Sequence, residues 1–229
     1  MAINWKKQGK LIGLIALAAV AAIVSEYAGM RLPFMVLKPL TTILIIALFW
    51  RLSGSLSTTS SCLMFGALCF CLLGDTLLLF ETLFVFGLAA FLLAHIGFIV
   101  VFVRTYGVRL SWLPTAIIGC AAAGYFYLLF PHLGALTVPV AVYLSVIISM
   151  VVLAVGMASY SGTSVARCVA LGAIVFAISD SVIAYNKFLH PVWWSTLVIL
   201  SLYWLAMTLL AIFVPALLAK GEAEQGITA

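Results

Sequence analysis

The chain has 229 residues, of which 66% are hydrophobic and only 7% charged, and its formal net charge is +5. A soluble domain is about 25% charged, so this composition excludes a soluble protein and indicates an integral membrane protein. Long uncharged runs indicate α-helices, because barrel strands would alternate polar and apolar residues over about ten positions.

A hydropathy window of about 19 residues predicts about eight transmembrane helices in a single domain that covers residues 1–229. The expected fold is therefore an all-α, polytopic membrane helix bundle. The approximate spans are 11–27, 36–50, 62–80, 83–103, 112–130, 136–158, 168–186 and 193–218.

Two features of these spans predict details of the local structure. The second span is short, and Pro39 stands near its start, where proline fits the first turn of a helix. Only Glu81 and Thr82 separate the third span from the fourth, which predicts a tight antiparallel hairpin.

The amino terminus permits two interpretations. Three lysines precede the apolar run 11–24, a pattern that also resembles a signal peptide cleaved near residues 21–22. The run is long enough to span a membrane, and Glu26 at its far end fits a retained helix. The sequence leaves both open.

Loop charges predict the orientation. With an even number of spans both termini share a side, and the positive-inside rule places them in the cytoplasm, as in a bacterial inner membrane. Eight of the eleven lysines and arginines lie on that side: Lys6, Lys7, Lys10, Arg51, Arg104, Arg109, Arg167 and Lys220. The basic residues are scattered over short loops, so we expect the bilayer, and no nucleic acid, as partner.

The five cysteines predict no metal or disulfide chemistry. They fall mostly in apolar runs and show neither a CxxC pair nor a Cys/His ligand spacing, so we interpret them as small packing residues. We expect no cofactor. Nothing in the sequence indicates an oligomeric state.

Asp75 and Asp180 lie inside predicted spans, about 7.5 Å and about 10 Å below the ends that face the same side. A carboxylate in hydrocarbon is costly, and such residues mark functional sites. Two carboxyl groups held close cannot both ionise easily, so together they supply a general acid and a general base. We expect both to face one water-reachable chamber under the outer headgroups.

Other polar residues cluster near the same outer layer. Lys187 follows Asp180 by seven residues and shares its helix face. Lys38 starts the second span, His95 lies near mid-membrane, and Glu26 ends the first span. Each has an ordinary alternative: lysines snorkel, a histidine bonds a neighbouring helix, and a glutamate lies solvated in a loop.

Familiar enzyme motifs are absent from the sequence. It contains no GxSxG elbow, no HExxH motif, no P-loop and no GxGxxG between a strand and a helix. No serine stands in a pattern that indicates a nucleophile. Gly74-Asp75 and Ser179-Asp180 share a small-then-Asp pattern in two spans of the same direction, so a duplicated four-helix unit is conceivable.

Four short motifs, in order, resemble the YhhN-like lysoplasmalogenase family, and the resemblance covers about residues 10–218. The motifs are KPLTT at 38–42, LGDTLL at 73–78, GLAAFLLAH at 87–95, and FAISDS at 176–181 leading to NKF at 186–188.

The resemblance implies a hydrolase that cleaves the vinyl-ether bond of a lysophospholipid, the lysoplasmalogen. The products would be a fatty aldehyde and glycerophosphoethanolamine or glycerophosphocholine. We hypothesise that one of Asp75 and Asp180 protonates the vinyl carbon while the other activates water, with His95 and Glu26 supporting the pair. No metal is required, although the two aspartates and His95 could in principle bind one.

The same hypothesis assigns the polar end of the lipid. Lys38 and Lys187 would hold the phosphate, while Asn186 and Tyr185 would hydrogen-bond the glycerol. The tail would lie between helices, with the headgroup at the outer surface and the active site toward the outer leaflet.

Two other functions stay open. A proton-coupled transporter of lipids or small molecules would use the same two aspartates as proton carriers. An intramembrane aspartyl protease also needs two membrane aspartates, but its usual signature has glycine two residues before the glycine of Gly-Asp, where this chain has Leu72.

Overall fold

The computed structural model describes residues 5–54 and 58–227, with side chains for 8–54 and 58–219. This part of the chain contains helices and no strand, which confirms the all-α class. The elements are α1 (Trp5–Tyr27), α2 (Arg31–Ser53), α3 (Thr59–Leu77), the 3-10 helix η1 (Glu81–Leu83), α4 (Phe84–Tyr106), α5 (Trp112–Leu133), the 3-10 helix η2 (Gly134–Leu136), α6 (Thr137–Ser161), α7 (Ser164–Phe188) and α8 (Ser195–Ile227).

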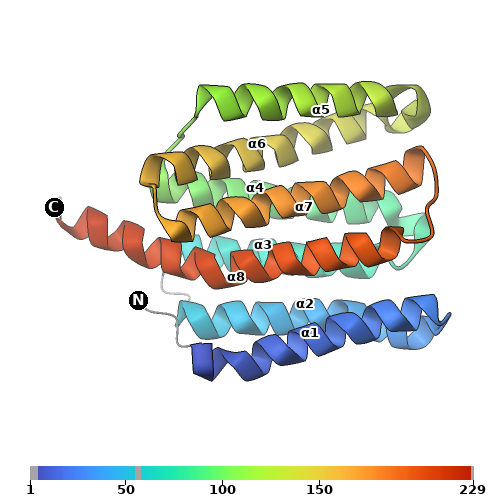
Figure 1. Ribbon diagram of the computed structural model, residues 1–229, viewed down its shortest axis with the longest axis horizontal. Helices are drawn as coiled ribbons and strands as arrows, with labels where there is room; N and C mark the ends of the chain where they lie inside the picture. The colour runs from blue at the N-terminus through green and yellow to red at the C-terminus, as the bar shows by residue number, and fades with distance from the viewer. Residues whose placement is uncertain (1–4, 55–57, 228–229) are drawn as a thin grey trace.

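Within the described residues, seven continuous helical stretches are long and apolar enough to cross a membrane. One of them, Trp112–Ser161, is 50 residues long and turns back on itself at η2, so that α5 and α6 run antiparallel (Figure 1). The protein is an integral, multi-pass membrane protein.

The core of the bundle and its surroundings are both apolar, as a bilayer allows. Large side chains stand outward, among them Trp112 at 81% and Trp193 at 83% exposure. The interior holds fully buried aromatic rings, including Phe49, Phe98 and Phe176.

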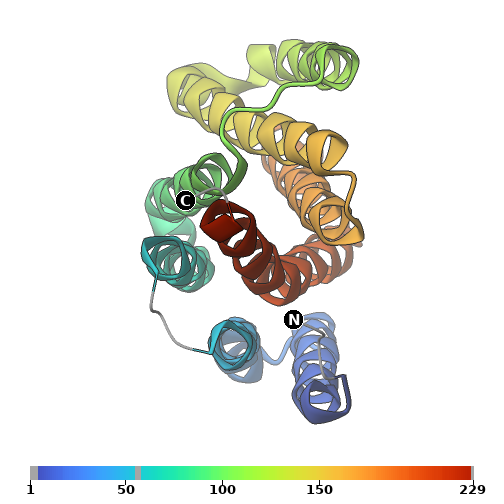
Figure 2. The same cartoon turned by 90° about the vertical axis from the view of Figure 1, so that its left-hand side faces the viewer.

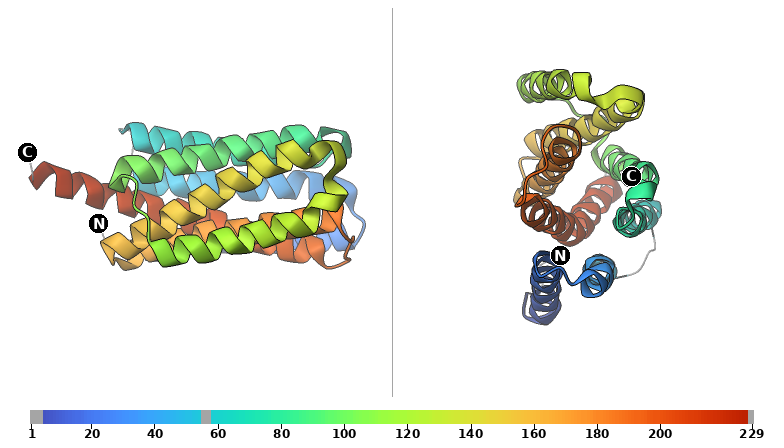
Figure 3. Two further views of the ribbon diagram at one scale, coloured as in Figure 1. Left: turned by 90° about the horizontal axis from the view of Figure 1, so that it is seen from above. Right: turned by 90° about the vertical axis from the view of Figure 1, so that its right-hand side faces the viewer.

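The end-on views show α8 in the middle of the bundle, with the α1–α2 hairpin on one side and α3 and α4 on another (Figures 2 and 3). Helix α8 packs most extensively on α7 and also contacts α1, α2, α3 and α4. Helix α5 lies at the periphery and packs mainly on α6.

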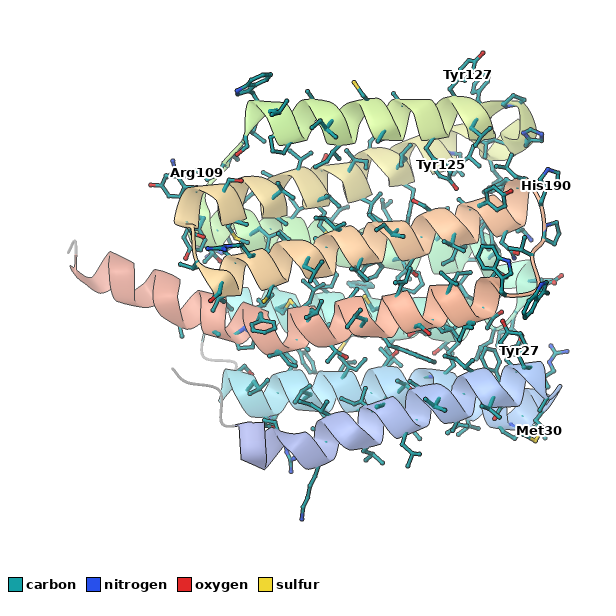
Figure 4. The ribbon with its side chains drawn as sticks, in the orientation of Figure 1. Tyr27, Met30, Arg109, Tyr125, Tyr127 and His190 are labelled. Atoms are coloured by element: carbon teal, nitrogen blue, oxygen red, sulfur yellow. The ribbon has the colours of Figure 1, made fainter. Side chains whose placement is uncertain are left out.

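Both candidate acids lie toward one end of the bundle. We call this the distal end; it carries Tyr27, Met30 and His190, whereas Arg109 lies at the other end, where α1 begins and α8 ends (Figure 4). The side chains of Lys6, Lys7 and Lys220, which entered the orientation prediction, lie outside the described residues.

Helix α2 differs from its predicted span. It begins at Arg31, and Pro39 lies inside it rather than in its first turn. Proline removes one backbone donor, which membrane helices tolerate when neighbouring helices pack around the site. The consequence is that Lys38 stands two turns inside the helix and is buried.

Candidate active site

Asp75 stands two residues before the end of α3 and is only 2% exposed. Its Oδ2 atom accepts two hydrogen bonds from other helices: one of 2.5 Å from the Thr42 hydroxyl of α2, and one of 2.8 Å from the Tyr203 hydroxyl of α8. Because both donors use the same oxygen, Oδ1 is left for another partner.

Lys38 provides a positive charge on the Asp75 side of the bundle. It is 8% exposed and interacts electrostatically with both Asp75 and Glu26. Among the described side chains it forms no ion pair within 4.0 Å. A buried ammonium of this kind is costly without an anionic partner.

Asp180 lies on α7, with a side chain that is 10% exposed. The Tyr143 hydroxyl of α6 donates a hydrogen bond to its Oδ2, and Nε2 of His95 on α4 lies 3.8 Å from the same oxygen. His95 itself is fully buried. Asp180 thus resembles Asp75: Oδ2 of each acid accepts a hydrogen bond from a tyrosine hydroxyl, and no described side chain donates to Oδ1.

The two acids form separate hydrogen-bonded clusters that lie within electrostatic reach of each other. No hydrogen bond joins the two carboxyl groups in the part of the chain that is described. The buried thiol of Cys71, one turn before Asp75, interacts with both acids and adjoins the Tyr203 hydroxyl.

Aromatic rings fill the space around the two clusters. The His95 ring meets the Phe176 ring at 4.7 Å and the Tyr143 ring at 5.5 Å between centroids. Tyr203 meets Phe176 at 5.4 Å and Phe91 at 5.7 Å. These edge-to-face contacts fix the orientation of the two tyrosines that hold the acids.

A partly enclosed apolar cavity of about 50 Å³ reaches Asp180. Asp75 is not among the residues that line it. The walls are Leu78, Phe84, Leu88, Phe91, Val140, Tyr143, Ile183, Ala184 and Phe188. The cavity therefore places apolar walls beside the Asp180 carboxyl group.

A wider, open cleft of about 720 Å³ lies at the distal end, between the α1–α2 turn and the α3–α4 turn. It exposes three charged side chains: Glu26, Arg31 and Glu81. Its other lining residues are Gly29, Phe34, Met35, Leu78, Leu79, Phe80 and Thr82.

The remaining sequence-predicted residues lie near the end of α7. Lys187 is exposed, with Nζ 5.1 Å from the centroid of the Phe84 ring. Oδ1 of Asn186 accepts a 2.8 Å hydrogen bond from the Val192 amide and so holds the turn into α8. Tyr185 stacks edge-on with His190 at 6.4 Å. Lys38 and Lys187 thus belong to different parts of the site.

Sequence reasoning missed four residues at this site: Thr42, Cys71, Tyr143 and Tyr203. Thr42 could have been found, because it shares a helix face with Lys38. The other three lie in apolar runs with no local signal. Within the described residues, no three His, Cys, Asp or Glu side chains gather in an arrangement that could hold a metal ion.

Comparison with known proteins gives the family. The model of the YhhN family matches residues 33–214. The chain belongs to the YhhN family. The resemblance seen in four short motifs is therefore confirmed. No solved structure matches the chain.

Several curated relatives of this YhhN family member carry the name lysoplasmalogenase. One from Mycobacterium bovis is 36% identical over 129 residues, which is 49% of this chain and 46% of the relative. Lysoplasmalogenase TMEM86A of Homo sapiens is 34% identical over 166 residues, covering 69% of this chain and 67% of that protein. Human lysoplasmalogenase TMEM86B is 29% identical over 177 residues, covering 76% and 72%. The chain spans just under half the length of the mycobacterial relatives it matches.

Proposed function

We propose that this protein is an intramembrane hydrolase that cleaves the vinyl-ether bond of lysoplasmalogens. The products are a fatty aldehyde and glycerophosphoethanolamine or glycerophosphocholine. The names of the relatives support the substrate class. The observation that carries the chemistry is the Asp180 carboxyl group at the end of an apolar cavity.

Vinyl ethers are hydrolysed by acid, and Asp180 is our candidate for the acid. Its carboxyl group transfers a proton to the alkene carbon remote from the ether oxygen, which leaves an oxocarbenium ion at the carbon bonded to that oxygen. The apolar walls suit the alkenyl chain, and the Tyr143 hydrogen bond holds the carboxyl group in position.

Asp75 is our candidate for the base. It accepts hydrogen bonds from two hydroxyl groups and lies near the Lys38 charge, and these interactions favour the carboxylate form. Its Oδ1 takes a proton from the water that adds to the oxocarbenium ion. The resulting hemiacetal breaks its bond to glycerol, giving aldehyde and alcohol, and the proton gained by Asp75 replaces the one lost by Asp180.

His95 supports the acids directly in this proposal, whereas Glu26 lies in the open cleft and acts only through its interaction with Lys38. His95 borders Asp180 and packs on Tyr143, so it positions the acid rather than touching the lipid. Lys38 attracts the phosphate toward Asp75. Lys187, beside the cavity wall residue Phe84, is a rival phosphate contact.

The decisive experiment measures aldehyde released from lysoplasmenylethanolamine by the purified protein in detergent. The expected result is release by the native chain and a loss of at least about 100-fold in Asp75→Asn and in Asp180→Asn, since general acids and bases contribute that much. The saturated alkyl-ether analogue should stay intact, because it has no alkene carbon to protonate.

Thr76→Val is the matched control for Asp75→Asn. Thr76 is the neighbouring residue, is exposed, and gives its hydroxyl hydrogen to the Leu72 carbonyl of its own helix. Aldehyde release by Asp75→Asn at the native rate would refute the pair. Uptake of lipid into proteoliposomes without any aldehyde would instead support the proton-coupled transporter.

We also propose a bacterial inner-membrane location with the distal end toward the outer leaflet, because eight of the eleven basic residues lie toward the opposite end. Cysteine accessibility at His190 and Arg109, each changed to cysteine, would test this orientation from either side of intact cells.

A further inference from the structure

Leu78 lines both the apolar cavity and the open cleft. It follows directly after α3 ends at Leu77, three residues beyond Asp75. Its side chain is half-buried and packs against the main hydrophobic core. One side chain therefore separates a space that ends at Asp180 from a space that opens at the distal surface.

The position of Leu78 depends on Gly87 of α4. A methyl group at Gly87 would lie 2.6 Å from Cδ2 of Leu78. The absence of a side chain at this point lets Leu78 lie flat against α4. The partition is thus held by packing and not by a hydrogen bond, so a ligand can displace it by a rotamer change.

The cleft contains both negative and positive side chains, which suits a ligand that carries a positive and a negative charge. Glu26 at the end of α1 and Glu81 in η1 supply carboxylates, and Arg31 at the start of α2 supplies a guanidinium. Among the described side chains none of the three is ion-paired within 4.0 Å. All are free to contact a ligand.

Beneath the cleft, α2 carries a second positive side chain, Lys38, closer to the acids than Arg31. From Arg31, successive turns of the helix carry Phe34 and Met35, which line the cleft, and then the buried Lys38. Lys38 interacts with Glu26 at the cleft and with Asp75 beside it. The cleft is therefore connected electrostatically to the Asp75 cluster.

We propose that the cleft and the cavity are the two halves of one binding site for a single-chain zwitterionic lipid, and that Leu78 is the partition the lipid displaces. The headgroup lies in the cleft, with its phosphate toward Arg31 and Lys38 and its cationic amine toward Glu26 and Glu81. The hydrocarbon chain passes Leu78 into the cavity, which brings the first carbons of the chain to Asp180. This inference rests on the proposed function and adds the residues that select the headgroup and position the chain.

Binding of a saturated alkyl-ether lysophospholipid tests this site without turnover, so the result does not depend on hydrolysis. The probe is used with a phosphocholine and with a phosphoglycerol headgroup, and both are titrated onto the detergent-purified protein. We expect the native chain to bind the phosphocholine form about tenfold more tightly, because two carboxylates repel a headgroup without a cation. The double variant Glu26→Gln and Glu81→Gln should bind both forms within about twofold.

The partition is tested by enlarging Leu78. Leu78→Trp should weaken binding of both forms by at least about tenfold, because the larger ring blocks the passage. Leu77→Trp is the matched control: it precedes Leu78 in the chain and is not among the residues lining either space. Leu78→Phe, a smaller enlargement, gives the same direction of effect if Leu78→Trp does not fold.

Three outcomes overturn the inference. The first is an unchanged headgroup preference in the Glu26 and Glu81 double variant. The second is native affinity in folded Leu78→Trp or Leu78→Phe. The third is loss of phosphate-dependent binding in Lys187→Ala with native binding in Arg31→Gln, which would place the headgroup at the end of α7. If the native chain binds as expected but releases no aldehyde from the vinyl ether, the proposed hydrolysis fails and this site stands.

Discussion

The Phe91 ring of α4 lies against the backbone of α3 at Gly74, the residue before Asp75. A methyl group on Gly74 would be 2.6 Å from Cε2 of that ring. Phe91 also meets the Tyr203 ring, whose hydroxyl group donates to Asp75. The close approach of α3 and α4 therefore determines where the hydrogen-bond donor of the acid stands.

Gly74→Ala should destabilise the protein by about 1–3 kcal/mol and lower aldehyde release, because the added methyl group pushes Phe91 against Tyr203. Unfolding in detergent and the rate with lysoplasmenylethanolamine measure the two effects. Gly66→Ala on the same helix is the control, since a methyl group there meets nothing within 4 Å. Equal behaviour of the two variants would contradict the packing argument.

The acids themselves could be predicted from the sequence, because a carboxylate in an apolar run is conspicuous whatever surrounds it. The small residues before them could not be explained at that level. Gly74 admits Phe91, whereas the fully buried Ser179 donates a hydrogen bond of 3.0 Å to the Ile199 carbonyl of α8. The shared pattern is thus used for two different contacts.

Helical periodicity predicted the face of Lys187 but not its surroundings. The neighbouring Asn186 is needed by the turn into α8, where it accepts a hydrogen bond from the Val192 amide. The tyrosines were not predicted because the partners of an acid come from helices distant in the chain. Tyr203 lies 128 residues from Asp75, and one sequence contains no signal for such a contact.

Two adjacent threonines on α2 allow a matched test of the Asp75 cluster. The Thr42 hydroxyl donates to Asp75, whereas the equally buried Thr41 hydroxyl donates to the Leu37 carbonyl of its own helix. Thr42→Val should lower kcat/KM about tenfold, since hydrogen bonds to charged groups contribute about 1.5–3 kcal/mol. Thr41→Val should stay within about threefold of the native rate. An effect of Thr41→Val as large as that of Thr42→Val would show that only packing is measured.

Removing the hydroxyl group of Tyr143 or Tyr203 should lower kcat/KM, whereas removing that of a tyrosine away from the acids should not. Tyr143→Phe and Tyr203→Phe each keep the ring contacts and remove the hydroxyl donor to one acid. We expect kcat/KM to fall about 10–100-fold in each, with unfolding little changed, because orientation of the acid is lost. Tyr127→Phe on the outward face of α5 is the control (Figure 4). Native rates in Tyr143→Phe and Tyr203→Phe would show that the two hydroxyl groups do not orient the acids.

The pH dependence of kcat/KM should separate the acid from the base. A base must be deprotonated and an acid protonated, so the rate falls toward low pH through Asp75 and toward high pH through Asp180. Residual activity in Asp75→Asn should therefore lose the low-pH limb and keep the high-pH limb, and Asp180→Asn should do the reverse. The opposite assignment of limbs would exchange the two roles.

Lys38 and Asp75 should be coupled in stability as well as in chemistry. Lys38→Met leaves Asp75 without its nearby positive charge, and Asp75→Asn leaves a buried ammonium without its carboxylate. Each change alone should destabilise the protein, because an uncompensated buried charge is costly. The double variant should recover part of the loss, giving a coupling free energy of about 0.5–3 kcal/mol in a double-mutant cycle of unfolding in detergent.

Lys187→Met combined with Asp75→Asn should show additive losses, because Lys187 lies beside Phe84 and not beside Asp75. Additive losses of unfolding free energy in the Lys38→Met and Asp75→Asn cycle would mean that Lys38 does not stabilise the fold through Asp75 and serves only to bind the ligand.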